Sequence, residues 1–154
     1  MDCYVFAAEP TDGTYRDLIR FCCSIATKML LVVREPEKNP DGELLSVLNR
    51  LQPFLLEKVL ADRWPGTVLF AHQARLYWYR ISDDLPSLLC ELKTSLFEWI
   101  HPDAPEDLCF CRDNGEPLLV TTSHENDAYL LLTADERAAL ESQFSDLAAE
   151  LQME

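Results

Sequence analysis

The dipeptide Asn114-Gly115 constrains the fold more than any other part of this chain. A tight two-residue turn of type I′ needs positive φ at both central positions, and Asn-Gly is the pair that most readily adopts it. With these two residues as the loop, Phe110 faces Leu119 and Cys109 faces Val120 on the flanking segments. The sequence therefore predicts an antiparallel strand pair on either side of this turn.

The predicted register decides where the cysteines near the turn point. Because side chains alternate between the two faces of a strand, Cys109 and Cys111 share one face with Leu118 and Val120. A Cys-x-Cys pair could bind a soft metal. However, such neighbours lie about 6.5–7 Å apart, at the limit for a disulfide, and free cysteine is among the most buried residue types. We therefore expect packed, reduced thiols, no metal and no cofactor.

The chain is strongly acidic, with 13 Lys or Arg against 27 Asp or Glu and a net charge of −14. The negative electrostatic field of such a chain repels phosphate groups and anionic lipids. We therefore expect that the protein binds neither nucleic acid nor a membrane. The same field would speed encounter with a basic protein, although acidity that serves solubility alone is the other interpretation. The chain has no apolar run of roughly 18 residues, and its first residues lack the basic region of a secretory signal. With six cysteines expected to stay reduced, we predict a cytoplasmic location.

Hydrophobic spacing and cap signals predict the remaining elements. The expected helices follow a capping box at Thr14–Asp17, follow Asn39-Pro40, span 85–100, and run from a capping box at Thr133–Glu136 to Leu151. The expected strands are 29–33, 128–132, and a hairpin of 68–72 with 75–81, whereas 54–62 fits either a helical turn or a strand. These elements predict one α+β domain over residues 1–154, mostly antiparallel sheet with about four helices packed on it. The oligomeric state stays open.

Polar residues beyond the Asn-Gly hairpin form the first candidate site. The predicted register brings them toward one end of the sheet: His101, Glu106, Asp107, His124, Glu125 and Asp127. Histidine and carboxylate side chains together can carry out acid–base catalysis or bind a hard metal ion. Their spacing matches no catalytic motif, and His124-Glu125 lacks the second histidine of a zincin helix. A solvated corner with capping hydrogen bonds is the alternative.

Aromatic residues form the second candidate site. Tyr77 and Tyr79 share one face of the predicted strand 75–81, and Trp64 opens the turn Trp64-Pro-Gly-Thr67. Tyrosine, tryptophan and arginine dominate the residues that carry binding energy at protein interfaces. These three residues would therefore contact a partner, unless a helix covers this face of the strand and makes them core.

Three segments carry a family resemblance: Arg63-Trp-Pro-Gly-Thr67, Trp99-Ile-His-Pro-Asp-Ala-Pro-Glu-Asp-Leu-Cys-Phe110 and His124-Glu-Asn-Asp-Ala-Tyr129. Over roughly residues 20 to 140 the chain resembles a small bacterial family without an assigned activity, some members of which carry the label stage III sporulation protein AH. The label implies a membrane-anchored protein, whereas we expect no anchor here. The resemblance implies no catalytic residues.

Two functions are compatible with these patterns. The first is a non-enzymatic acidic interaction protein of the immunity or inhibitor type, which binds a basic protein through its acidic residues and the aromatics Trp64, Tyr77 and Tyr79. The second is a hydrolase or metal-dependent enzyme that uses His101, His124, Glu125 and Asp127. The second requires those four side chains to converge within about 4–5 Å in a concavity.

Overall fold

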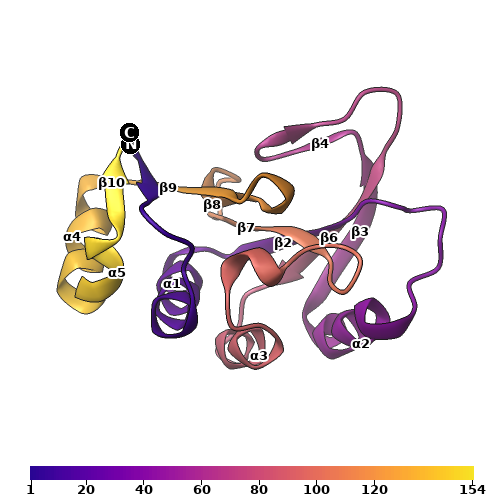
Figure 1. Cartoon of the computed structure of the whole chain (residues 1–154), viewed down its shortest axis with the longest axis horizontal. Helices are drawn as coiled ribbons and strands as arrows, with labels where there is room; N and C mark the ends of the chain where they lie inside the picture. The colour runs from indigo at the N-terminus through magenta and orange to yellow at the C-terminus, as the bar shows by residue number, and fades with distance from the viewer.

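Eight antiparallel strands form a continuous sheet in the computed structural model, which describes all 154 residues (Figure 1). The strand order is β10-β1-β9-β8-β7-β2-β6-β3. The strands are β1 (Asp2–Phe6), β2 (Lys28–Val33), β3 (Leu55–Ala61), β6 (Ala74–Arg80), β7 (Glu106–Cys111), β8 (Pro117–Thr122), β9 (Asp127–Leu132) and β10 (Leu151–Met153). The predicted α+β class with a mostly antiparallel sheet is confirmed.

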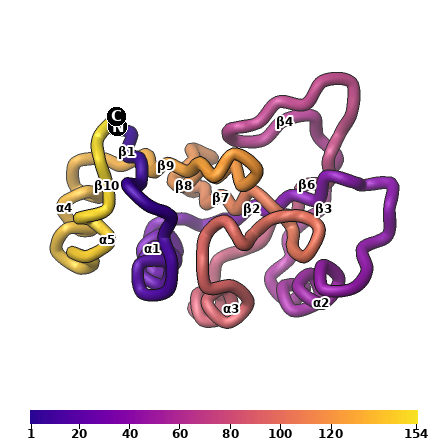
Figure 2. Tube along the Cα trace, viewed as in Figure 1, coloured from indigo at the N-terminus to yellow at the C-terminus, as the bar shows by residue number.

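Helices cover one face of this sheet, and a short arm covers part of the other (Figures 1 and 2). The helices are α1 (Asp12–Ile25), α2 (Gly42–Leu51), α3 (Leu85–Leu92), α4 (Ala134–Gln143) and α5 (Ser145–Ala149), with 3-10 turns η1 (Gln52–Phe54), η2 (Leu96–Glu98) and η3 (Ser123–Glu125). The arm is the two-stranded ribbon of β4 (Arg63–Trp64) and β5 (Thr67–Val68). The main core of 33 buried residues and a second core of eight, which includes Trp64 and Leu69 of the arm, hold these layers together.

The hairpin of β7 and β8 is present, but its turn differs from the prediction. Phe110 pairs with Leu119 as expected, whereas Arg112 pairs with Glu116 through a 2.8 Å hydrogen bond, so the loop has three residues. Gly115 has φ of +89°, whereas Asn114 does not have the positive φ that a type I′ turn needs. The Gly115 N–H donates to the Arg112 carbonyl at 2.9 Å, so residues 112–115 form a turn that ends in a left-handed glycine, the common form of a three-residue hairpin loop. A register shift between Phe110 and Cys111 then restores the predicted pairing.

The cysteines are all free thiols. Cys109 and Cys111 are buried, and burial raises the pKa of each thiol. Cys109 packs in the second core with Val120, as predicted, but Leu118 belongs to the main core on the opposite face. The register shift accounts for this correction, because it interrupts the alternation of side chains at Leu118.

The predicted start of α1 and the predicted end of α3 are wrong. Helix α1 is capped by Thr11, three residues before the predicted cap Thr14, and the Thr14 hydroxyl instead accepts a hydrogen bond from the Thr11 N–H at 3.1 Å. Helix α3 ends at Leu92 and does not reach Ile100. There the Glu98 carboxylate accepts hydrogen bonds from both hydroxyls of Thr94 and Ser95, each at 2.8 Å, and these local contacts replace helical ones.

Non-local pairing produces the remaining differences. The predicted hairpin of 68–72 with 75–81 is wrong, since β6 pairs with β2 and β3, and Val68 instead pairs with Arg63. The capping box at Thr133–Glu136 is confirmed by a 3.1 Å bond from the Glu136 N–H to the Thr133 hydroxyl. The helix that follows does not continue to Leu151, because β10 starts there and pairs with β1. No helix has the length and apolar character required to cross a membrane.

Candidate functional site

A buried ionic network lies where β7 begins. Glu106 and Asp107 are both completely buried, and Asp107 has φ of +56°, in the left-handed region. Arg34, just after β2, reaches both carboxylates: its Nε lies 2.9 Å from Glu106 Oε2 and its Nη2 lies 3.4 Å from Asp107 Oδ2. The pairing of β2 with β7, in which Val32 faces Glu106, brings Arg34 to this place.

Both carboxylate oxygens of Asp107 accept hydrogen bonds. The Trp64 indole donates to its Oδ2 at 3.0 Å, and the Ser123 N–H donates to its Oδ1 at 2.9 Å. The Arg34 guanidinium lies over the Trp64 ring, 4.9 Å from the ring centroid. Asp107 therefore ties β7 to the arm and to η3, and its oxygens are fully engaged.

Glu106 also contacts the histidine that the sequence places at this end of the sheet. His124 Nε2 lies 3.0 Å from Glu106 Oε1, and the His124 side chain is 51% exposed. A cavity of about 390 Å³ opens beside this pair, lined by Arg34, His124, Glu125, Thr122 and the turn residues 66–69. Glu106 Oε2 faces Arg34 and Glu106 Oε1 faces His124, so this carboxylate links the segment after β2 to η3.

The other predicted members of the His–carboxylate corner lie elsewhere. His101 lines a separate cavity of about 270 Å³ with Glu35, Lys38 and Asp41. Asp127 lines a third cavity, described below. No group of three or more His, Cys, Asp or Glu residues is placed to hold a metal ion. The structure thus brings Glu106 and His124 into contact and places Asp107 on the same Arg34, whereas His101, His124 with Glu125, and Asp127 line three different cavities.

The three aromatic residues predicted to contact a partner are buried. Trp64, Tyr77 and Tyr79 are 6%, 7% and 1% exposed, respectively. Tyr77 and Tyr79 stack on each other, with ring centroids 6.4 Å apart, and belong to the main core beneath the helices. For Tyr77 and Tyr79 the structure agrees with the alternative in which a helix covers this face, whereas Trp64 is buried in the second core, beneath the arm.

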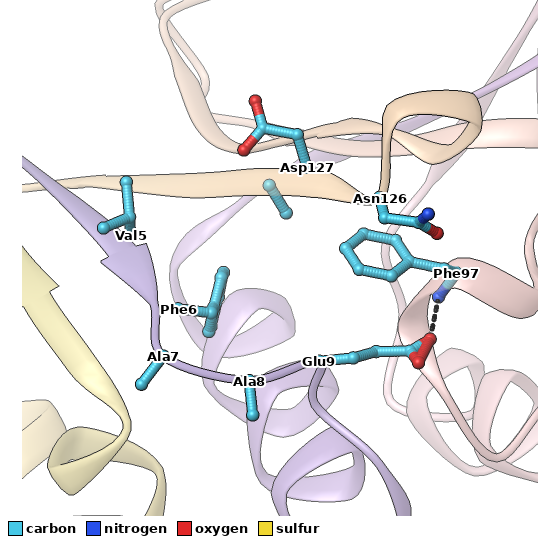
Figure 3. Close-up of a pocket in the computed structure, with 9 residues that line it drawn as sticks. Val5, Phe6, Ala7, Ala8, Glu9, Phe97, Asn126 and Asp127 are labelled. Carbon is cyan, nitrogen blue, oxygen red and sulfur yellow. Dashed lines mark hydrogen bonds between the residues drawn. The ribbon is translucent and has the colours of Figure 1, made fainter.

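A cavity of about 370 Å³ lies between β9 and the segment that leads from β1 into α1 (Figure 3). We call it the β1–β9 slot, and its lining residues are Val5–Glu9, Phe97 and Asn126–Ala128. The rings of Phe6 and Phe97 project into it, whereas the Asp127 carboxylate points away across β9. Glu9 accepts a 2.9 Å hydrogen bond from the Phe97 N–H, so its carboxylate lies beside the Phe97 backbone.

Sequence reasoning missed Phe6, Glu9 and Phe97 as site residues. The one available signal is that Phe97 lies off the apolar stripe of the predicted helix 85–100. An aromatic residue outside the stripe that faces the core needs another place to pack. The neighbour it uses, the segment after β1, is about 90 positions away in sequence, so no local pattern indicates the contact.

Charge is distributed unevenly over the molecule. Residues 113–154 hold ten Asp or Glu and a single Lys or Arg, whereas residues 42–81 hold three acidic and five basic residues. These segments occupy opposite ends of the sheet, orange to yellow and purple to magenta in Figure 1. The single base of the first segment, Arg137, is already engaged, since its Nε lies 2.8 Å from Glu141 and its guanidinium lies over the Tyr4 ring. We call residues 113–154 the acidic end.

Glu136 is a second carboxylate of the acidic end, besides Glu141, that pairs with an arginine of the chain. Arg112 Nη2 and Nε lie close to the two carboxylate oxygens of Glu136, at 2.6 and 3.3 Å. Burial alone would raise the pKa of Glu136, but the hydrogen bonds from Arg112 and Thr133 outweigh burial and hold this pKa below its ordinary value. Exposed acidic residues such as Asp135, Glu141 and Asp146 remain on the surface.

Comparison of the chain with models of known protein families, with curated proteins and with solved structures gave no match. The resemblance to the small bacterial family therefore stays a prediction. The three segments that carry it nevertheless meet in the buried network. Trp64 contacts Asp107, Glu106 contacts His124, and the Ser123 hydroxyl just before the third segment donates to the Trp99 carbonyl at 2.7 Å.

Proposed function

We propose that this chain is a non-enzymatic binding protein whose acidic end docks on a basic protein, as an inhibitor of the immunity type would. The observation that carries the proposal is the charge asymmetry: ten acidic residues and one already paired base lie within residues 113–154. A charged surface of one sign steers the encounter with a partner of the opposite sign and disfavours like-charged competitors.

The contact surface differs from the one expected from the sequence. Because Trp64, Tyr77 and Tyr79 are core residues, the partner would meet exposed carboxylates instead of aromatic anchors. Glu125 and Asp127, both exposed at the end of β8 and the start of β9, remain part of this surface. The buried network supports it indirectly, since it fixes η3 and hence the position of Glu125.

Charge reversal at the acidic end tests the proposal. The immobilised protein is incubated with native lysate at about 50 mM NaCl, where screening is weak, and retained proteins are identified by mass spectrometry. We expect a basic protein to be retained and released as salt rises. We expect no retention of this basic protein by the triple variant Asp135→Lys, Glu141→Lys, Asp146→Lys.

A matched variant distinguishes local charge from total charge. The substitutions Glu37→Lys, Glu43→Lys and Glu57→Lys change the net charge equally, but these exposed residues lie outside the acidic end. This variant should retain the basic partner. If the wild type retains no basic protein, or if both triple variants lose the partner equally, the acidic end is not a docking surface.

A further inference from the structure

We infer that the β1–β9 slot receives an arginine side chain of the basic partner. This inference rests on the proposed function and names the group that the acidic end would recognise. The slot has a volume of about 370 Å³, and none of its lining residues is basic. Ligand pockets in proteins start at about 300 Å³, so the slot has room for one side chain but not for a folded element.

The walls of the slot suit both parts of an arginine side chain. Phe6 and Phe97 are partly buried, and their rings face the space between β9 and the segment after β1 (Figure 3). They offer apolar surface to a methylene stem and a π face to a guanidinium. Glu9 places a carboxylate at the Phe97 backbone, where one of its oxygens already accepts the Phe97 N–H. The second oxygen is free to accept from a guanidinium.

The same chain uses this combination twice for its own arginines. Arg34 lies 4.9 Å from the Trp64 ring centroid and contacts Glu106 and Asp107. Arg137 lies 4.9 Å from the Tyr4 ring centroid and contacts Glu141. Each places a guanidinium over an aromatic ring and pairs it with a carboxylate, a combination that suits planar guanidinium better than ammonium. The slot likewise has aromatic rings, those of Phe6 and Phe97, and a carboxylate, that of Glu9, among its lining residues.

The location of the slot adds long-range attraction. Asn126, Asp127 and Ala128, which form one wall, belong to the acidic end, so the local field favours a cation entering from solvent. Asp127 points away from the rings and contributes only through this field. Charge complementarity therefore selects a basic side chain over an apolar or acidic one.

A small-molecule titration tests the slot directly. The probe is acetyl-arginine amide, followed by amide chemical shifts in two-dimensional NMR spectra of the full chain, with acetyl-citrulline amide as the neutral probe of the same shape. We expect saturable shifts at Glu9, Phe97 and Asn126 with the arginine probe, with affinity in the millimolar range, and none with the citrulline probe. Equal binding of both probes, or no saturable shift at these residues, overturns the inference.

Variants separate the slot from general acidity. Phe97→Leu keeps an apolar side chain but removes the ring, and it should weaken the arginine probe about two- to fivefold, the value of an exposed cation–π contact. Glu9→Gln should also weaken it. Glu116→Gln, which removes the same charge from an exposed position outside the slot, should leave affinity unchanged. If Glu116→Gln weakens the probe as much as Glu9→Gln, the attraction is not specific to the slot.

The capture experiment distinguishes failure of the slot from failure of the proposed function. If Phe97→Leu and Glu9→Gln still retain the basic partner as the wild type does, while reversal of Asp135, Glu141 and Asp146 abolishes retention, then the acidic end docks the partner and the slot takes no part. If the arginine probe binds in the slot but no basic protein is retained, the slot is an arginine-binding site and the proposed function is wrong.

Discussion

Asp107 shows how a single buried residue can hold several elements together. It is fully buried, accepts hydrogen bonds from Trp64 and Ser123, and lies 3.4 Å from Arg34. Two buried carboxylates at adjacent positions are costly to desolvate unless their oxygens are satisfied. Each contact made by Asp107 offsets part of that cost, so the network is more sensitive to the loss of one member than a surface ion pair would be.

We predict that Asp107→Asn destabilises the fold by about 2–4 kcal/mol, because it leaves Arg34 and the Trp64 N–H facing an amide that can donate as well as accept. Asparagine tolerates the left-handed backbone at this position, so the loss reports charge and hydrogen bonding and not strain. Urea unfolding measures the loss. Asp113→Asn, in the exposed hairpin loop, should change stability by less than about 0.5 kcal/mol. Equal unfolding midpoints for the two variants would refute the structural role of the network.

Residues of the network differ in how far the sequence indicates them. Glu106, Asp107 and His124 stand at the ends of predicted strands, and the hairpin register alone brings them to one end of the sheet. Arg34 and Ser123 carry no such signal. Arg34 follows an apolar run, and only the non-local pairing of β2 with β7 gives it a role. Trp64 is indicated as an aromatic contact residue, but its partner Asp107 makes it a buried hydrogen-bond donor.

Elements with strong local signals are predicted best. The run 29–33, the run 128–132 and the capping box at Thr133 are all local patterns, and each corresponds to an observed element. Strand β10 has only three residues. The sequence predicts the end of a helix there, because Leu147 and Leu151 keep helical spacing. The pairing of β10 with β1, about 150 positions away, is decided by tertiary contacts. The same holds for β6, which pairs with β2 and β3 and not with its neighbour in sequence.

The arm of β4 and β5 depends on one glycine. Gly66 has φ of +87°, and a Cβ added there would lie 2.8 Å from Val120 Cγ1 and 3.2 Å from Thr122 Oγ1. The turn therefore presses its backbone directly onto β8. Only a residue without a side chain meets both requirements, the left-handed backbone and the close approach.

We predict that Gly66→Ala is more destabilising than Gly115→Ala. Gly115 has nearly the same φ, +89°, but open space around it, so Gly115→Ala carries the backbone strain alone, about 1–2 kcal/mol. Gly66→Ala adds the clash with β8, which must displace the arm and weaken the Trp64–Asp107 contact. Urea unfolding gives the difference, and tryptophan fluorescence should report a more exposed indole in Gly66→Ala only. Equal losses for both variants would show that the arm adapts to the added carbon.

The whole molecule combines a long sheet with charge of opposite character at its two ends. Composition gives the net charge of −14, but only the fold shows that the acidic residues of 113–154 gather at one end while 42–81 lies at the other. Apart from Glu136 and Glu141, which pair with Arg112 and Arg137, the carboxylates of the acidic end have no ion-pair partner. Their mutual repulsion destabilises the compact state, and dissolved salt screens it.

We therefore predict that two substitutions with the same change in charge have unequal effects at low salt. Glu116→Lys lies in the acidic end and should raise the thermal midpoint, because it replaces repulsion with attraction. Glu57→Lys, on β3 within the more basic segment 42–81, should leave the midpoint unchanged or lower it. Both residues are exposed, so neither change removes a packed side chain. The difference should vanish in about 1 M NaCl, where the screening length falls to roughly 3 Å. A difference that persists in 1 M NaCl would mean that local structure, and not the field of the acidic end, sets the stability of these positions.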